Sequence, residues 1–386
     1  MSSKQTYSDN SVKIATFGFM KKYACIQDKC INDCCNSWTI EIDKPTLEKW
    51  KAKAPDLLES IEQNPYRPET LRMQTTGEEK SCVQLQGGIC SIHKNKGAEM
   101  LPEICNYFPQ MYKAFNSKIY LTGTTSCPAV AYIILNEEEE TNFKISDHFV
   151  SIKKSLGQIS EYGNGLGGQN IGSMVAKVMD FVSSFSNPRQ AVKSLYFASK
   201  LFDETKQSQL SQNIDSILKL SNVSLKAFTV NDDFEENIFD NIIDLTLNIT
   251  TRNKPFITLI LQKLNELKLQ GITPLALYRE YEAAKDGFVK NKKYLRRFIK
   301  VKLAENFFPA SSFASHTEDF IVLYCEYLII DFVIALFYSH GLKDERTIGD
   351  IIHSIDREFY AKKRSRIMDL IKAQNLDKIE NLFALQ

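Results

Sequence analysis

The chain has 386 residues, of which 43% are hydrophobic and 25% charged, a composition ordinary for a folded globular protein. This length accommodates two or three domains and an ample hydrophobic core. The formal net charge of +1 excludes the strong overall field that attracts nucleic acids or acidic membranes, so we expect neither as a partner.

Residues 1–135 predict a small α+β region of short elements. Residues 38–42 alternate apolar and polar side chains, as a half-buried strand does. Asp43 then offers a helix N-cap, and Pro45 suits the first turn of that helix. A second short strand is predicted over residues 118–121.

Residues 136–386 predict a larger helical region. An acidic run at 137–140 indicates a solvated linker, and the glycine-rich residues 163–173 indicate a flexible loop. Apolar residues then recur every three or four positions, which is typical of amphipathic helices. These helices are expected near 171–186, 190–202, 208–220, 235–249, 255–269, 274–285, 292–304, 317–339 and 346–373. The expected fold class is therefore mainly α, with a small cysteine-rich α+β metal-binding domain before a helical domain that binds substrate or partner.

The most apolar stretch, residues 320–338, contains Glu326 and Asp331. Carboxylates in the middle of a membrane span are costly, so we interpret the stretch as a buried core helix. Each carboxylate then needs a partner. A structural ion pair or hydrogen bond is favoured over a catalytic role.

Eight of the nine cysteines lie within one third of the chain, and only Cys325 lies outside it. The eight are Cys25, Cys30, Cys34, Cys35, Cys82, Cys90, Cys105 and Cys127. The first residues lack the continuous apolar segment of a secretory signal, so we expect a cytoplasmic, reducing location. Dense cysteines there favour metal binding over structural disulfides.

Four or more of these thiols are expected to hold one metal centre, either an iron–sulfur cluster or zinc. The side chains of the adjacent Cys34 and Cys35 diverge, so one of them serves a second metal or stays a free thiol. Gly87 and Gly88 before Cys90 allow close backbone approach to a cluster. His93 is either a ligand, a residue supporting a ligand, or a plain surface histidine.

Several motifs together resemble those of the flagellin lysine N-methylases. They are Cys25-x4-Cys30-x3-Cys34-Cys35, Trp38, Gly88-x-Cys90-x-x-His93, Cys105-Asn106-Tyr107-Phe108-Pro109 and Ser126-Cys127-Pro128. They cover residues 23–130, and the helical remainder is similar to that family in length and character. The family belongs to a wider group of cysteine-cluster proteins that are candidates for chelating zinc or iron.

The resemblance implies a protein-lysine N-methyltransferase. Its substrate would be flagellin, its methyl donor S-adenosylmethionine, and its cysteine motif would hold a [4Fe–4S] cluster. The chain departs from the family at Gln110, where a basic residue is expected. An alternative from the residues alone is a non-catalytic zinc- or iron-binding adaptor whose helical part binds a partner.

A conventional site for S-adenosylmethionine is not recognisable. Gly163-x-Gly165-x-x-Gly168 has the spelling of a nucleotide loop, but the preceding residues look helical and no βαβ unit follows. Tyr107 and Tyr112, beside Cys105, are weak candidates for catalytic residues and more ordinary as core aromatics. A basic stretch at residues 290–302 is interpreted as a solvated helix face rather than a binding surface.

Overall fold

The computed structural model describes most of the chain. The described residues are 12–26, 29–30, 34–36, 39–77, 80–115, 118–136, 144–150, 170–225, 235–249, 254–284, 293–310, 315–342, 344–362 and 364–378. The expected linker at 137–140 and the Gly163–Gly168 pattern lie outside them, as does Trp38.

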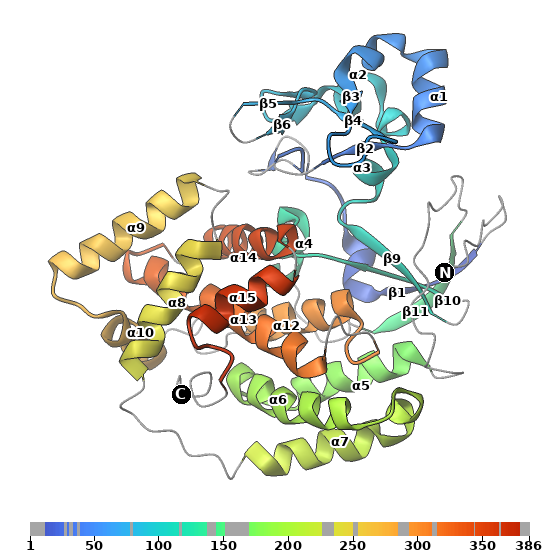
Figure 1. The fold of residues 1–386 in the computed structure, drawn as a ribbon. Coiled ribbons are helices and arrows are strands. Elements are labelled where there is room, and N and C mark those ends of the chain that lie inside the picture. Colours follow the sequence, from blue (N-terminus) through green and yellow to red (C-terminus); the bar gives the residue numbers. More distant parts are fainter. Residues whose placement is uncertain are drawn as a thin grey trace.

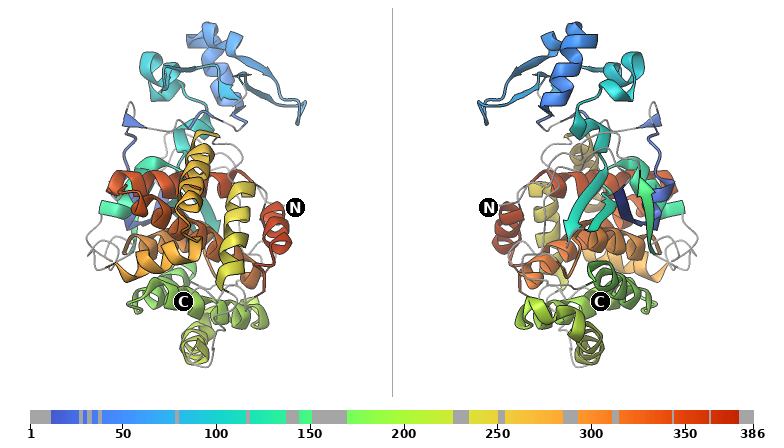
Figure 2. Two further views of the ribbon diagram at one scale, coloured as in Figure 1. Left: turned by 90° about the vertical axis from the view of Figure 1, so that its left-hand side faces the viewer. Right: turned by 90° about the vertical axis from the view of Figure 1, so that its right-hand side faces the viewer.

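A four-stranded sheet covers one side of the helical body (Figures 1 and 2). Its strand order is β11 (Ile145–Val150), β1 (Val12–Phe17), β10 (Lys118–Gly123) and β9 (Gln110–Phe115). Strands β1 and β10 are parallel, and the other two pairs are antiparallel. The strand predicted at residues 118–121 is therefore confirmed as part of β10.

The chain between β1 and β9 forms a small unit above the helical body (Figure 1). Its strands are β2 (Glu41–Ile42), β4 (Leu71–Met73) and β3 (Ile61–Gln63) in one antiparallel sheet, with the pairs β5 (Thr75–Thr76) with β6 (Ser81–Cys82) and β7 (Leu85–Gln86) with β8 (Ile89–Cys90). Its helices are α1 (Lys44–Lys53), α2 (Ser91–Lys96) and α3 (Glu103–Tyr107). The Asp43 carboxylate accepts a hydrogen bond from the Thr46 amide at 2.8 Å, so the predicted N-cap is confirmed.

Helices build the rest of the molecule. They are α4 (Pro128–Asn136), α5 (Ile171–Ser183), α6 (Pro188–Glu204), α7 (Leu210–Leu225), α8 (Glu235–Ile249), α9 (Lys254–Leu269), α10 (Pro274–Ala283), α12 (Lys293–Asn306), α13 (His316–Ser339), α14 (Glu345–Ala361) and α15 (Arg364–Ala373). The mainly α fold class is thus confirmed.

Helix α13 lies at the centre of the helical body. It is apolar all round, and such a helix must be buried on every side. It is the one helix among the described residues that is long and apolar enough to cross a membrane, and its whole apolar window is buried by the other elements. The predicted core helix is therefore confirmed.

Three expectations about the elements need correction. The strand expected over residues 38–42 is limited to β2. The single helix expected at 346–373 is two helices, α14 and α15, which end and begin on either side of Lys362 and residue 363. Residues 171–173 of the expected glycine-rich loop form the first turn of α5, which Asn170 caps.

The basic stretch at residues 290–302 is not a solvated face in its described part. Lys302 is 5% exposed, and the Arg296 guanidinium donates to the Phe185 carbonyl at 2.8 Å. The Arg297 guanidinium donates to the Ile134 carbonyl at the same distance. The carbonyls at helix ends lack partners within their own helix, so these cations face inward to bind them.

Candidate metal centre

The eight clustered cysteines gather into two groups. The first, here named the Tyr23 group, surrounds the Tyr23 phenol and consists of Cys25, Cys30, Cys34 and Cys127. Burial raises the pKa of Tyr23, and the four thiols add to this effect because each lies close enough to interact with the phenol electrostatically. Cys25 and Cys34 are exposed, so this group is open to solvent.

The second, named the inner group, lies in the small hydrophobic core of the unit and consists of Cys35, Cys82, Cys90 and Cys105. Cys35 and Cys82 are buried in that core, and the other two pack against it. The Cys82 amide donates to the Cys35 carbonyl at 2.9 Å. Burial raises the pKa of Cys105, and the thiols of Cys34, Cys90 and Cys82 raise it further.

Cys34 lies between the two groups. The Cys35 thiol makes hydrogen bonds with Cys34 and Cys90, and these bonds and burial raise its pKa. The hydrogen bond with Cys35 lowers the pKa of Cys90 to about 6, against the opposing effect of burial. The hydrogen bonds of Cys35 with Cys34 and Cys90 therefore link the two groups of thiols.

A tight hairpin places Cys90. Gly87 and Gly88 have φ values of +59° and +79°, and they are the two central residues of the β7–β8 turn. A two-residue hairpin with positive φ at both positions favours glycine strongly. The turn brings Cys90 to the start of α2, where the amides of Ile92 and His93 hydrogen-bond to its thiol.

Cys127 occupies the start of a different helix, α4. The amides of Val130 and Ala129 hydrogen-bond to its thiol, and a helix N-terminus stabilises a thiolate. Burial is the larger effect and raises the pKa of Cys127 to about 12. Unlike the inner group, Cys127 belongs to the large hydrophobic core of the helical body.

The donor chemistry of both groups fits zinc or an iron–sulfur cluster, because thiolates are the ligands that both prefer. Among the described residues, no three histidine, cysteine or acidic side chains are yet arranged to hold a metal ion. Cys25, Cys30, Cys34 and Cys35 lie on turns and coil. They can therefore close around a metal without breaking a helix or strand. Ligation by the eight cysteines stays a prediction.

The two candidate tyrosines lie next to the inner group. The rings of Tyr107 and Tyr112 meet edge to face at 5.6 Å, and the Tyr112 hydroxyl donates to the Gln110 side chain at 2.8 Å. Burial raises the pKa of both phenols. A raised pKa keeps a phenol protonated, so both are hydrogen-bond donors rather than bases near neutral pH.

A buried polar network contacts the two residues that precede Cys127. The Lys302 ammonium contacts Asp356 at 2.7 Å and Glu326 at 3.5 Å. The Asp356 carboxylate also accepts hydrogen bonds from the hydroxyls of Thr125 and, at 3.2 Å, Ser126. Burial works against ionisation of Asp356, yet Lys302 and these hydrogen bonds lower its pKa, whereas burial raises the pKa of Glu326.

The carboxylates expected in the most apolar stretch both have partners. Glu326 joins Lys302, and Asp331 lies 3.3 Å from the Arg189 guanidinium and accepts a hydrogen bond from Tyr278. The expectation of structural pairing is therefore confirmed. Asp356 was missed by sequence reasoning, although it lies four residues after Ile352 and three before Phe359, on the apolar face of α14. The signal in the sequence that could have identified Asp356 is a carboxylate on the apolar face of a predicted helix.

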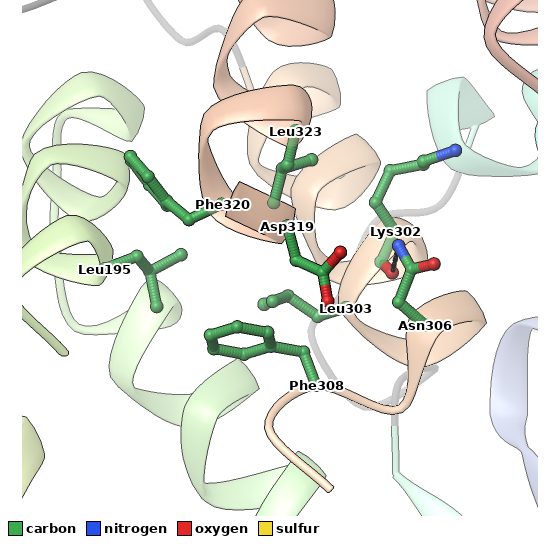
Figure 3. A pocket seen from close by; sticks show the side chains of 8 residues that line it. All are labelled: Leu195, Lys302, Leu303, Asn306, Phe308, Asp319, Phe320 and Leu323. Atoms are coloured by element: carbon green, nitrogen blue, oxygen red, sulfur yellow. Dashed lines mark hydrogen bonds between the residues drawn. The ribbon is translucent and has the colours of Figure 1, made fainter. Parts of the chain in front are cut away.

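A small pocket between α6, α12 and α13 does not locate a cofactor site. Figure 3 shows Lys302, Asp319 and Asn306 on one side of it and apolar side chains on the other. Its free volume of about 10 Å³ holds roughly one water molecule. Cofactor pockets commonly need some 300 Å³ or more.

Two family profiles match the chain. The profile "FliB lysine N-methylase C-terminal domain" matches residues 183–385, and "Putative zinc- or iron-chelating domain" matches residues 24–128. The first match spans more than half of the chain. The chain belongs to the FliB lysine N-methylase family. The resemblance inferred from the cysteine motifs is thereby confirmed.

Curated relatives of this FliB-family chain come from Salmonella. The chain is similar to a lysine-N-methylase of Salmonella typhimurium, with 26% identity over 31% of the chain and 32% of that methylase. It is also similar to the flagellar biosynthetic protein FliU of Salmonella muenchen, with the same identity over 76% of FliU. The chain thus spans about a third of the length of the methylase. No solved structure matches it.

Replacing Asp356 by asparagine should destabilise the FliB-family chain by about 1–3 kcal/mol, because the variant removes the closest counterion of the buried Lys302 and leaves only Glu305 and Glu326, at 3.1 and 3.5 Å, to balance its charge. Urea unfolding measures this change. The matched control is Glu48→Gln, which breaks an exposed ion pair with Lys51 and should change stability by less than about 0.5 kcal/mol. Equal effects of the two variants would contradict the network.

The buried His353 should make stability sensitive to acid. Burial and the charge of Arg357 lower its pKa to about 3, so in mild acid the unfolded chain binds a proton that the folded chain does not. Above pH 6.5 His353 is neutral in both states and costs no stability; as the pH drops from 6.5 toward 3, the free energy of unfolding falls by up to about 1.4 kcal/mol per pH unit.

Unfolding at pH 7.5 and 5.5 tests this effect in the wild type and in His353→Leu. We expect the wild type to lose about 1 kcal/mol more than the variant between the two values. Parallel losses in both proteins would show that His353 does not titrate on unfolding.

Proposed function

We propose that this chain is an S-adenosylmethionine-dependent methyltransferase that N-methylates lysine side chains of flagellin, with a [4Fe–4S] cluster on its thiols. The observation that carries the proposal is the match to the methylase family over residues 183–385, beside a chelating-domain match whose thiols gather in space. The lysine-N-methylase name of the Salmonella relative supports the reaction, and the name FliU supports a flagellar substrate. The dense cysteines support a cytoplasmic location, since clustered metal-binding thiols are typical of a reducing compartment.

Methyl transfer sets a clear requirement for the lysine. Its ammonium must first lose a proton to solvent, because only the neutral amine has a lone pair to attack the methyl carbon. The carbon–sulfur bond then breaks, S-adenosylhomocysteine leaves, and the nitrogen keeps the methyl group.

The protein residues would hold and shield this chemistry. Tyr107 lies two residues after Cys105 of the inner group and contacts Tyr112 edge to face, so the two rings would help to exclude water from the site, while the helical body would bind flagellin. Desolvation at such a site favours the neutral lysine.

We also propose that the eight thiols hold two centres. One zinc ion or one [4Fe–4S] cluster takes four cysteine ligands at most, and eight thiols are gathered. The inner group, buried in the small core, suits a structural centre. The Tyr23 group, with exposed Cys25 and Cys34, suits a reactive one.

Anaerobic incubation with S-adenosylmethionine and purified flagellin tests the activity. Mass spectrometry should find steps of about 14 daltons on flagellin lysines, one for each methyl group. Unchanged flagellin, with the metal centre intact, would reject the methyltransferase. Flagellin that is bound without any change in mass would support the adaptor instead.

Metal analysis of single variants tests the assignment of two centres. Cys127→Ser should lose the metal of the Tyr23 group only, and Cys105→Ser that of the inner group only. Cys325→Ser is the matched control, because this thiol is buried in the helical body outside both groups and should retain all metal. Loss of the same metal in both single variants would show one centre.

A further inference from the structure

Helix α14 contacts two segments that carry cysteines, the one next to Cys35 and the one next to Cys127. Its apolar residues Ile348, Ile351, Ile352, Ile355 and Phe359 are buried in the core of the helical body. Its polar side chains near the C-terminal end reach toward the small unit. This helix therefore joins the helical body to the cysteine-bearing loops.

Asp356 holds the first of these loops. The hydroxyls of Thr124 and Ser126 donate to its Oδ2 atom, both at 3.2 Å, and the Thr125 hydroxyl donates there too. All three belong to the turn that ends at Cys127, whose amide donates to the Thr124 carbonyl at 3.3 Å. Three hydroxyls on one buried carboxylate fix the position of this turn, because the loss of any of them removes a hydrogen bond from a buried charge.

Arg357, the next residue of α14, holds the second loop. Its Nη2 atom donates to the Asn36 carbonyl at 2.8 Å, a contact between residues 321 positions apart. Asn36 directly follows Cys35. Two consecutive residues of one helix thus hydrogen-bond to the segments next to one cysteine of each group. Arg357 binds the Asn36 carbonyl, and Asp356 binds the three hydroxyls before Cys127.

The helix itself is held firmly against α4, which begins just after Cys127. The Tyr132 hydroxyl donates to Asp350, and a Cβ atom at Gly349 would collide with the Tyr132 ring. The close approach of the two helices therefore needs glycine at this position. Because α4 and α14 are packed as one unit, a shift of α14 would move both loops.

We infer that Asp356 and Arg357 are positioning residues, through which the helical body places Cys35 and Cys127, one thiol in each of the two proposed centres. This inference rests on the proposed metal binding. It gives the helical domain a role in assembling the site, beyond the binding of substrate. Residues that orient ligands through hydrogen bonds commonly change metal affinity by 10- to 100-fold.

The test measures metal retention in Arg357→Ala, purified without oxygen. Metal per chain and the rate of metal loss to a chelator are compared with the wild type, together with the melting temperature and the visible absorption spectrum. We expect loss on the order of 10-fold faster, with little change in melting temperature. Arg357→Lys keeps a cationic donor and should restore part of the retention.

Arg366→Ala is the matched control, since Arg366 is exposed on α15. Metal loss from Arg357→Ala at the rate of this control would overturn the inference. Should Arg357→Ala fail to fold, Thr125→Val decides, because it removes one hydroxyl at nearly constant shape: faster metal loss supports the inference and a wild-type rate overturns it. A wild type without any metal would instead refute the proposed function.

Discussion

The buried carboxylate of Asp356 is the constraint on which the site depends. A fully buried negative charge is tolerated only with a close counterion and several hydrogen bonds, and here Lys302 and three hydroxyls provide them. These partners come from α12 and from the turn before α4, so one charge ties together segments distant in sequence. The turn carries Cys127, so a thiol of the site lies next to a segment that a buried carboxylate holds in place.

The two groups of thiols differ in their surroundings. The inner group shares a small core with Trp50, a side chain fully removed from solvent whose indole donates to the Met100 carbonyl at 2.8 Å. The Tyr23 group spans the boundary between that unit and the helical body, because Cys127 belongs to the large core. A small core has little hydrophobic stabilisation of its own, and metal ligation is a common way to supplement it.

Several features of the site followed from local chemistry in the sequence. The Asp43 cap depends on residues adjacent in the chain, and it is present. Gly87 and Gly88 were expected to allow close approach to a cluster, and the structure shows that they form the β7–β8 turn. The burial of α13 followed from its continuous apolar composition. In contrast, the cations of α12 were expected to face solvent. They turn inward because carbonyls of α4 and α5 offer acceptors, and those helices are distant in the sequence.

The sequence by itself determined the helical fold class, the family and the set of candidate thiols, since periodicity and cysteine spacing are local properties of the chain. Only the tertiary structure decided how the thiols divide between two cores, and which buried charges support them. The contact between Arg357 and Asn36 joins residues 321 positions apart, and no local pattern specifies such a pair. The packing of whole helices decides which distant residues meet. Local patterns in the sequence do not specify that packing.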